Sequence, residues 1–327
     1  MASLIHGSRL AFFFNQSPLP NDQRKHANLQ RFESPLSMTV PRILIQLDSD
    51  AQASTFDAVV AVDAGVEQLF RHGSVTEENV TGLVHGAMFT RGGEQLQSTA
   101  LFIGGTDVVA GERLLSAVKQ AFFGPVRVSV MLDSNGCNTT ASAAVLSAGK
   151  HLDLSTITAL VMGGTGPVGR RVARLLGRQG ATVRIGSRSP ERAEQAAAEV
   201  AVSLEDAQLH GVSTAGDVGL DAALDGCQAV FACGAAGVQL IDADALKRAS
   251  ELRLLVDLNA VPPAGIAGVA ATDKGATDAL GRIAYGALGV GGLKMKIHRA
   301  AIEQLFQAND HVLDADQIYA IGEGLLP

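Results

Sequence analysis

Tryptophan is absent from this chain of 327 residues, and tyrosine occurs only twice. Aromatic residues amount to 4% of the sequence, so few rings are available to stack on a flat ligand. Acidic residues outnumber basic ones by 33 to 26, which gives a formal net charge of −7. This balance argues against a protein that binds nucleic acid or anionic membranes by general electrostatic attraction.

Cysteine is also scarce. Cys137, Cys227 and Cys233 form no CxxC pair and no cluster with histidine, so neither a zinc site nor a disulfide framework is expected. We therefore expect no metal site and a reduced, cytoplasmic location. No apolar run approaches the roughly 18 residues that a membrane span requires.

The first 38 residues lack a periodic apolar pattern. Their apolar patch at residues 10–14 is shorter than the core of a signal peptide. We interpret residues 1–38 as a disordered extension or a start-site artefact, with Met38 as an alternative start.

Glycine, in contrast, is abundant, with 36 residues, and strand-like segments alternate with helix-like ones after the extension. Residues 42–47, 98–105 and 126–132 are apolar runs typical of buried strands. Residues 107–122 have apolar residues at helical spacing, and residues 138–148 are rich in alanine. The alternation predicts a first α/β layer of about 110 residues.

A glycine-rich loop then joins a buried strand at 157–164 to an amphipathic helix. In such a loop the first glycine permits a tight turn, the second lets backbone N–H groups approach a pyrophosphate, and the third lets helix and strand pack closely. Apolar strands at 182–186, 227–233 and 252–258 continue the alternation of a doubly wound parallel sheet of the Rossmann type. The loop residues predicted to bind a dinucleotide are Gly164, Thr165, Gly166, Pro167, Val168 and Gly169.

The end of the next strand indicates which dinucleotide binds. An NAD site usually has Asp or Glu there to bind the ribose hydroxyls, but this sequence has Ser187, Arg188 and Ser189, with no carboxylate before Glu191. An arginine and two hydroxyls can bind a 2′-phosphate. The pattern favours NADP over NAD, and NAD use stays possible; the alternative is that Arg188 is a solvated residue near a helix N-terminus.

A polar group follows the strand at 126–132. Asp133 and Asn135 lie at its end, and Thr140 enters the next helix. Two interpretations are equally open: a polar site at the carboxyl end of a strand, or an N-cap of the helix.

Two further residues are candidates because of their positions. Asn259 follows the strand at 252–258, where the nicotinamide is expected. Lys294 follows a glycine-rich loop at 285–292 and is expected at the positive start of a helix, an unfavourable place for a cation. A functional or paired lysine is therefore indicated, whereas His298 is interpreted as a packed or surface residue.

The chain resembles the methylenetetrahydromethanopterin dehydrogenase family of bacterial one-carbon metabolism over residues 42–322. The resemblance lies in collinear segments that include FDAVVAVDAG, FTRGG, QSTALFIGG, FFGPVRVSVMLDSNG, GGTGPVGRRVA, ATDKG and YGALGVGGLKMKIHRA. It implies an N-terminal α/β catalytic lobe of residues 39–150 plus about 290–327, an NADP-binding Rossmann domain of residues 151–289, and a C-terminal helix that returns to the first lobe. It also implies a homo-oligomer.

The activity that the resemblance implies is hydride transfer from methylene-tetrahydromethanopterin to NADP, which yields the methenyl carrier in formaldehyde oxidation. The catalytic residues carried over from it are Phe56, Asp57 and Lys294, with Asp133 and Thr140 near the substrate. Our hypothesis is that Lys294 pairs with Asp57 or binds a substrate carbonyl. Two alternatives stay open from the residues: a methylenetetrahydrofolate dehydrogenase and a non-catalytic, NADP-sensing Rossmann protein.

Overall fold

The computed structural model describes residues 40–202 and 204–326, and the predicted extension 1–38 lies outside them. Five parallel strands form a first sheet in the order β12-β4-β3-β1-β2. The order departs from β1 in both directions, so a crevice is expected where the carboxyl ends of β1 and β3 diverge. The strands are β1 (Ile43–Asp48), β2 (Gln68–His72), β3 (Thr99–Gly104), β4 (Ser129–Leu132) and β12 (Val312–Leu313).

Three helices belong to this layer, and a side-chain cap marks the start of two of them. Ser54 caps α1 (Thr55–Asp63) by accepting the Asp57 N–H, and Asp107 caps α3 (Val108–Ala121) by accepting the Ala110 N–H. The predicted helix at 107–122 is thus confirmed. The third helix is α2 (Val80–Met88), and short 3₁₀ turns lie at Gly93–Ser98, Ser134–Gly136 and Leu154–Thr156.

Seven strands form the second sheet, in the order β10-β11-β9-β8-β5-β6-β7. All neighbours are parallel except β10 and β11. The order reverses between β5 and β8, as in the doubly wound sheet that the sequence predicts. The strands are β5 (Thr158–Met162), β6 (Thr182–Ser187), β7 (Leu209–Ser213), β8 (Ala229–Ala232), β9 (Leu254–Asp257), β10 (Lys274–Thr277) and β11 (Ile283–Tyr285).

Helices connect these strands, as the parallel order requires. Residues 190–201 form one of them, with proline at the first helical position and Ser189 as the cap. The helices are α5 (Pro167–Arg178), α6 (Pro190–Ala201), α7 (Gly216–Leu224) and α8 (Ala243–Arg248).

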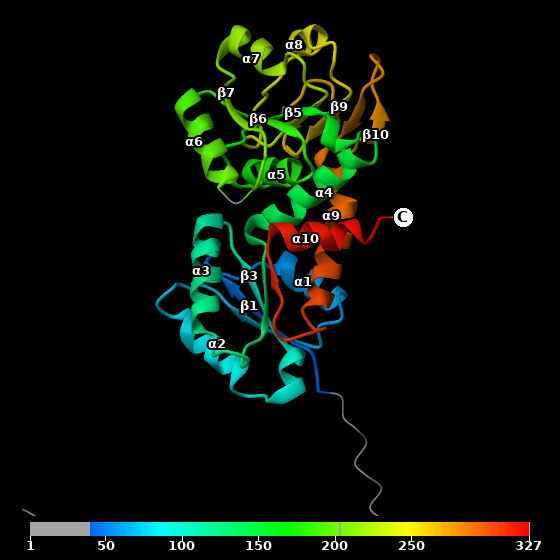
Figure 1. Cartoon of the computed structure of the whole chain (residues 1–327). Helices are drawn as coiled ribbons and strands as arrows, with labels where there is room; N and C mark the ends of the chain where they lie inside the picture. The colour runs from blue at the N-terminus through cyan, green and yellow to red at the C-terminus, as the bar shows by residue number, and fades with distance from the viewer. Residues whose placement is uncertain (1–39, 203, 327) are drawn as a thin grey trace, which may run out of the picture. The chain divides into compact units, whose positions relative to one another are not determined.

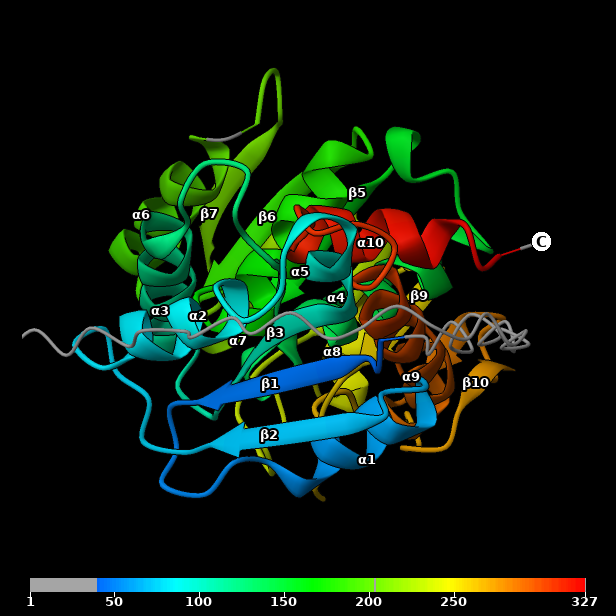
Figure 2. The ribbon, with the colours of Figure 1, turned by 90° about the horizontal axis from the view of Figure 1, so that it is seen from below.

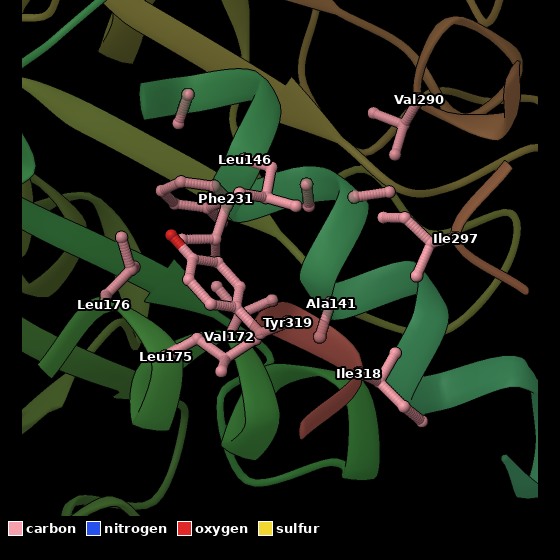
Figure 3. Packing of buried hydrophobic residues seen from close by; sticks show 14 of the residues in the cluster. Ala141, Leu146, Val172, Leu175, Leu176, Phe231, Val290, Ile297, Ile318 and Tyr319 are labelled. Carbon is pink, nitrogen blue, oxygen red and sulfur yellow. The ribbon is translucent and has the colours of Figure 1, made fainter. Parts of the chain in front are cut away.

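Helices α4 (Cys137–Gly149), α9 (Ala287–Gln304) and α10 (Ala315–Glu323) lie between the two sheets (Figure 1). Because α4 is buried on nearly all sides, its small, uncharged residues fit where larger ones would not. One apolar cluster reaches through these helices from Phe102 in the first sheet to Phe231 in the second. Figure 3 shows part of it, with Leu146, Val172 and Tyr319 on three different helices.

The chain returns to the first sheet at its C-terminal end. Helix α9 packs against α1, and β12 pairs with β4. Figure 2 shows α1 and α9 side by side, near the tails of the β1 and β2 arrows. The α/β class and the returning helix are therefore confirmed, while both sheets lie in one compact unit, so the boundary between residues 150 and 151 stays a prediction. None of the helices in the described ranges is long and apolar enough to cross a bilayer.

The glycine-rich segment 285–292 was expected to be a loop, and that expectation is wrong. Helix α9 starts at Ala287, so Gly289, Gly291 and Gly292 are helical. The backbone of the β10 region passes so close that a Cβ on Gly289 would overlap the carbonyl oxygen of Asp273. Glycine at this position permits close packing rather than a turn.

This contrast predicts opposite effects for two alanine substitutions in one helix. Gly289→Ala should lower the free energy of unfolding by about 2 kcal/mol, because its methyl group meets a backbone carbonyl that cannot rotate away. Gly291→Ala should raise it by about 0.5–1 kcal/mol, because nothing lies within 4 Å of the added methyl and alanine favours the helix. Urea unfolding of both variants measures the difference; equal effects would contradict the close approach at Gly289.

Candidate active site

The carboxyl end of β1 fixes the start of α1. Asp48 is fully buried, and its Oδ2 accepts the Ser54 N–H at 2.9 Å. Ser54 in turn caps α1, which places Asp57 in the first turn. A Cβ built on Gly104, the last residue of β3, would lie 3.6 Å from Asp57 Oδ2. The Asp57 carboxylate therefore lies at the end of β3, inside the predicted crevice.

Phe56 and Lys294 lie beside this carboxylate. The Phe56 ring is 53% exposed, and Lys294 Nζ lies 5.7 Å from its centroid, within the range of a cation–π contact. Across residues 40–202 and 204–326 no ion pair involves Lys294, so the expected pairing with Asp57 is not formed. The sequence also misplaced Lys294: it lies near the middle of α9 rather than at its positive start. The exposed ring and the ammonium are both accessible to a ligand.

Asp133 caps helix α4. Its Oδ1 accepts the N–H groups of Asn138 and Thr139 at 2.9 and 3.0 Å, and its Oδ2 accepts the Thr139 hydroxyl at 2.6 Å. Thr140 donates its hydroxyl to the carbonyl of Gly136 at 2.6 Å. Of the two interpretations that the sequence left open, this geometry favours the cap for Asp133, whereas Thr140 bonds to the carbonyl four residues before it. The exposed Asn135 is the member of the group whose side chain faces solvent.

Gly136 lies under the lysine. Its φ is +60°, a conformation that glycine adopts at little cost. A Cβ at this position would collide with Lys294 Nζ. The turn after β4 thus needs glycine for its backbone conformation, and the contact places the end of the Lys294 side chain directly against this turn.

Burial shifts the pKa values of three groups in this crevice. It raises the pKa of Asp57, against the opposing charge of His298, and it raises the pKa of Asp133 to about 6 despite the nearby Lys294. It also lowers the pKa of His298 to about 4. Perturbed titratable groups gathered in a crevice are typical of a functional site.

The loop after β5 has the geometry of a dinucleotide cradle. A Cβ on Gly164 would lie 2.7 Å from Ile185, and one on Gly169 would lie 2.6 Å from the carbonyl oxygen of Gly163. On Gly166 the nearest atom would be 3.4 Å away, so this stretch of backbone is open. Gly166 is the N-cap of α5 and provides no side-chain acceptor, which leaves the first N–H groups of the helix to an anion. The residues present fit a pyrophosphate.

A cavity of about 680 Å³ extends from this loop past the end of β6. Ser187, Arg188 and Ser189 all line it. The Ser187 hydroxyl also accepts the Ser189 N–H, and the Ser189 hydroxyl caps α6 by accepting the Arg192 N–H. Arg192 also lines it, and sequence reasoning missed this residue. The spacing of four residues between Arg188 and Arg192 could have indicated that both face the same ligand. That inference requires knowing that α6 starts at Pro190, which places Arg192 in its first turn beside the cavity.

Asn259 has a structural role in its loop. Its Oδ1 accepts the N–H groups of Gly237 and Val261 at 3.2 and 3.0 Å, and its Nδ2 donates to the carbonyl of Pro263 at 3.0 Å. The loop includes a cis peptide bond between Pro262 and Pro263. The predicted contact of Asn259 with the cofactor stays a prediction. Because its side chain is bound to the backbone of its own loop, Asn259 would act by holding that loop in place beside the cofactor.

Arg171 joins the two parts of the site. This buried residue of α5 donates to Pro167 O at 3.2 Å, to Glu112 Oε1 at 2.9 Å and to Asn138 Oδ1. Asn138 lies in the first turn of α4, next to the Asp133 cap. The start of the dinucleotide helix and the turn after β4 are thus one arginine side chain apart. In the described ranges no group of three His, Cys, Asp or Glu residues could hold a metal ion.

Comparison with known proteins finds relatives along most of the chain. A family model described as methylene-tetrahydromethanopterin dehydrogenase, N-terminal, matches residues 55–135, and one described as the NAD dependent epimerase/dehydratase family matches residues 159–254. The bifunctional protein MdtA of Methylorubrum extorquens AM1 is 45% identical over 86% of this chain and 98% of its own. The NAD(P)-dependent methylenetetrahydromethanopterin dehydrogenase of the same strain is 30% identical over 82% of this chain and 93% of its own.

Solved structures are more distant. A ligand-free 5-ketofructose reductase of Gluconobacter sp. strain CHM43 has a TM-score of 0.49 and 12% identity, covering 88% of this chain and 99% of that one. Quinate dehydrogenase of Corynebacterium glutamicum, in complex with NAD, has a TM-score of 0.48 and 13% identity, covering 87% and 99%. Both TM-scores lie below 0.5, and the α/β assignment rests on the sheet orders described above.

The raised pKa of Asp133 predicts a pH-dependent stability effect. A carboxyl whose folded pKa is raised contributes stability at low pH that is lost as pH rises through about 6. Asp133→Asn can still accept the capping N–H groups but does not ionise. Its free energy of unfolding relative to the natural protein should therefore rise by about 1 kcal/mol between pH 5 and pH 7.5.

Urea unfolding at the two pH values measures this change. Asp107→Asn is the matched control, because Asp107 also caps a helix but lies exposed at the start of α3. A difference between Asp133→Asn and the natural protein that stays constant with pH would contradict the prediction.

Proposed function

Because the chain belongs to the methylenetetrahydromethanopterin dehydrogenase family, we propose that it oxidises methylene-tetrahydromethanopterin to the methenyl form with NADP as hydride acceptor, in formaldehyde oxidation. The observation that carries the proposal is the pairing of a dinucleotide cradle with a separate group of side chains, Phe56, Asp57 and Lys294, at the end of β3 in the first sheet. The N-terminal family model spans the first two of these residues.

The two alternatives are less favoured. A methylenetetrahydrofolate dehydrogenase would act on a similar pterin, but the 30% identical relative is named for the methanopterin carrier. A non-catalytic NADP sensor would need the cradle alone, and it leaves the half-buried Asp57 and the buried His298 without a purpose.

The chemistry requires little acid–base help from the protein. The carbon that loses hydride lies between two nitrogens, which delocalise the positive charge that develops, so no base has to remove a proton from it. Bound NADP supplies the nicotinamide ring that accepts the hydride. The protein's contribution is to orient the pterin, exclude water and stabilise the developing charge.

Each residue of the crevice suits one of these tasks. Phe56 offers an exposed ring on which a flat pterin can stack. The Asp57 carboxylate can stabilise a developing cation, and burial strengthens this interaction because it lowers the local dielectric. Lys294 would oppose that cation if it lay beside the reacting carbon, so its role is to bind a carbonyl oxygen of the substrate. Asn135, exposed and next to Gly136, is a second substrate contact, whereas Asp133 and Thr140 hold the turn.

The cofactor would be held by the loop Gly164–Gly169, by the start of α5, and at its 2′-phosphate by Arg188 and Arg192. Two arginines at one cavity support NADP over NAD, and NAD remains a second acceptor. Ser187 and Ser189 fix the start of α6, from which Arg192 extends.

We also propose a cytoplasmic homo-oligomer that binds neither nucleic acid nor membranes. The acidic composition and the family resemblance support this part of the proposal. Light scattering coupled to size exclusion measures the oligomeric state, and a monomer would contradict it.

The function is tested by the absorbance of reduced nicotinamide with methylene-tetrahydromethanopterin as substrate and NADP and NAD compared. Lys294→Met should lower kcat/KM for this substrate about 100-fold, because the proposed contact between the ammonium and a carbonyl oxygen of the substrate is lost. The KM for NADP should change little. Lys296→Met is the matched control, since Lys296 is exposed two residues along the same helix. No hydride transfer by the natural protein, despite NADP binding, would favour the sensor.

The cofactor assignment predicts that each of two arginines contributes to NADP affinity. Arg188→Ala and Arg192→Ala should each raise the KM for NADP about 10- to 100-fold, because each removes a charge-assisted hydrogen bond to the 2′-phosphate, and should leave the KM for NAD almost unchanged. Arg113→Ala, which removes an exposed arginine of α3, is the control. Equal effects on both cofactors would show that the arginines do not read the 2′-phosphate.

A further inference from the structure

His298 is enclosed by aromatic rings at the back of the crevice. Its side chain is 0% exposed. The imidazole stacks on Phe102 of β3, with centroids 5.6 Å apart and planes 19° apart, and meets the ring of Phe56 at 6.4 Å and 38°. The exposed ring proposed to bind the pterin therefore rests on a histidine.

Neither ring nitrogen of His298 has a hydrogen-bond partner in the described ranges. Leaving a buried polar group unpaired costs about 1–3 kcal/mol, and such groups are rare in folded proteins. A phenylalanine or leucine would fill the same space without this cost. The unpaired nitrogens need an explanation other than packing.

The charged groups that face His298 are few. Asp57 on α1 and Lys294 on its own helix both act on its charge, and Asp133, after β4, faces Asp57 in turn. Phe102 is the contact from β3, and α4 carries no charged residue. From α10, Asp316 is already paired with Arg174 and Arg178. Among these groups, Asp57 is the carboxylate whose charge acts on His298, which makes it the candidate acceptor for a ring N–H.

We propose that His298 is a positioning residue that stays neutral, supports the Phe56 ring from behind, and donates one ring N–H to the Asp57 carboxylate when substrate fills the crevice. The inference rests on the proposed function and adds a role to His298, which the sequence analysis interprets as a packed or surface residue. The donor holds Asp57 in its charged form and in one orientation while the substrate becomes cationic.

A neutral imidazole suits this role. Burial, together with the charge of Lys294, lowers the pKa of His298 to about 4, although Asp57 acts in the opposite direction. At neutral pH the ring therefore carries one N–H and no charge, so it can donate to Asp57 without adding positive charge beside the developing cation. A hydrogen bond to the charged form lowers the pKa of a carboxyl, so its loss moves the Asp57 titration to higher pH.

His298→Phe keeps an aromatic ring and removes the donor. Its kcat/KM for methylene-tetrahydromethanopterin should fall about 10-fold, and the acid limb of its pH profile should move up by about 0.5–1 pH unit. His298→Asn keeps an N–H donor and should recover the position of that limb. His85→Phe is the matched control, because His85 also packs on a phenylalanine, Phe89 at 5.3 Å, but on α2. A His298→Phe enzyme with the natural rate and pH profile would reduce His298 to packing and overturn the proposal.

A measurement without turnover separates this inference from the proposed function. Nitrogen NMR of the histidine-labelled natural protein, with methylene-tetrahydromethanopterin bound and NADP absent, should show His298 as a neutral imidazole at pH 6, and Asp57→Asn should change its ring nitrogen shifts. A His298 cation at pH 6, or shifts that ignore Asp57→Asn, would overturn the proposal even if the enzyme is active. If the natural protein shows no hydride transfer but the NMR result holds, the proposed function fails and the His298–Asp57 coupling stands.

Discussion

The rest of the site depends on the hydrogen bonds that the buried guanidinium of Arg171 donates. It is 8% exposed and binds Glu112 on α3, Asn138 on α4 and the carbonyl of Pro167 on its own helix. Removing a charge from water costs several kcal/mol unless its hydrogen bonds are all replaced. Arg171 can therefore remain buried only where these three helices meet in one arrangement. An apolar side chain at this position would allow the three helices to pack in several ways, whereas the charged Arg171 allows only the arrangement that satisfies its hydrogen bonds.

Asn138 extends this constraint to the substrate side. Its Nδ2 donates to the carbonyl of Leu132 at the end of β4 and to Asp314 before α10, while its own N–H is bound by Asp133. A displacement of α5 would thus be felt at the turn that carries Asn135 and supports Lys294. This is a physical reason why a dinucleotide cradle in one sheet and a polar crevice in the other can serve a single hydride transfer, for which the reacting atoms must meet within about 3–3.5 Å.

Much of this arrangement could be predicted from local sequence signals. The loop Gly164–Gly169, the Asp107 cap and the doubly wound order follow from glycine spacing, a capping residue and apolar runs, each of which acts over a few residues. The α9 start was missed for a different reason. Gly289 is required because the backbone at Asp273 passes close to it. Asp273 lies outside the few residues over which local sequence signals act, so the residues around Gly289 resemble those of a flexible loop.

The functional residues divide in the same way. Phe56 and Asp57 were identified through the family resemblance, and Lys294 through both its position and the resemblance. The structure brings Phe56 and Lys294 into contact, beside Asp57. Arg192 and His298 were missed because their roles depend on tertiary position: one is turned into the cofactor cavity by the start of α6, and the other is enclosed by rings from two other elements. A lone histidine on a helix gives no sign of which side chains will surround it. Long-range enclosure, rather than residue type, makes these two residues candidates.

Burial shifts the pKa of each titratable group of the crevice so that the neutral form is favoured. It raises the pKa of Asp57 and Asp133 and lowers that of His298, so each group holds its charge less readily than in water. An acid–base enzyme would use such shifts to exchange protons at neutral pH. Hydride loss from a carbon between two nitrogens exchanges none, so the shifts must have another use. In a site shielded from water, the Asp57 carboxylate interacts more strongly with a cation than it would at the surface. The burial that makes this carboxylate costly to ionise also makes it effective once the substrate becomes positive, and a neutral donor beside it offsets part of that cost.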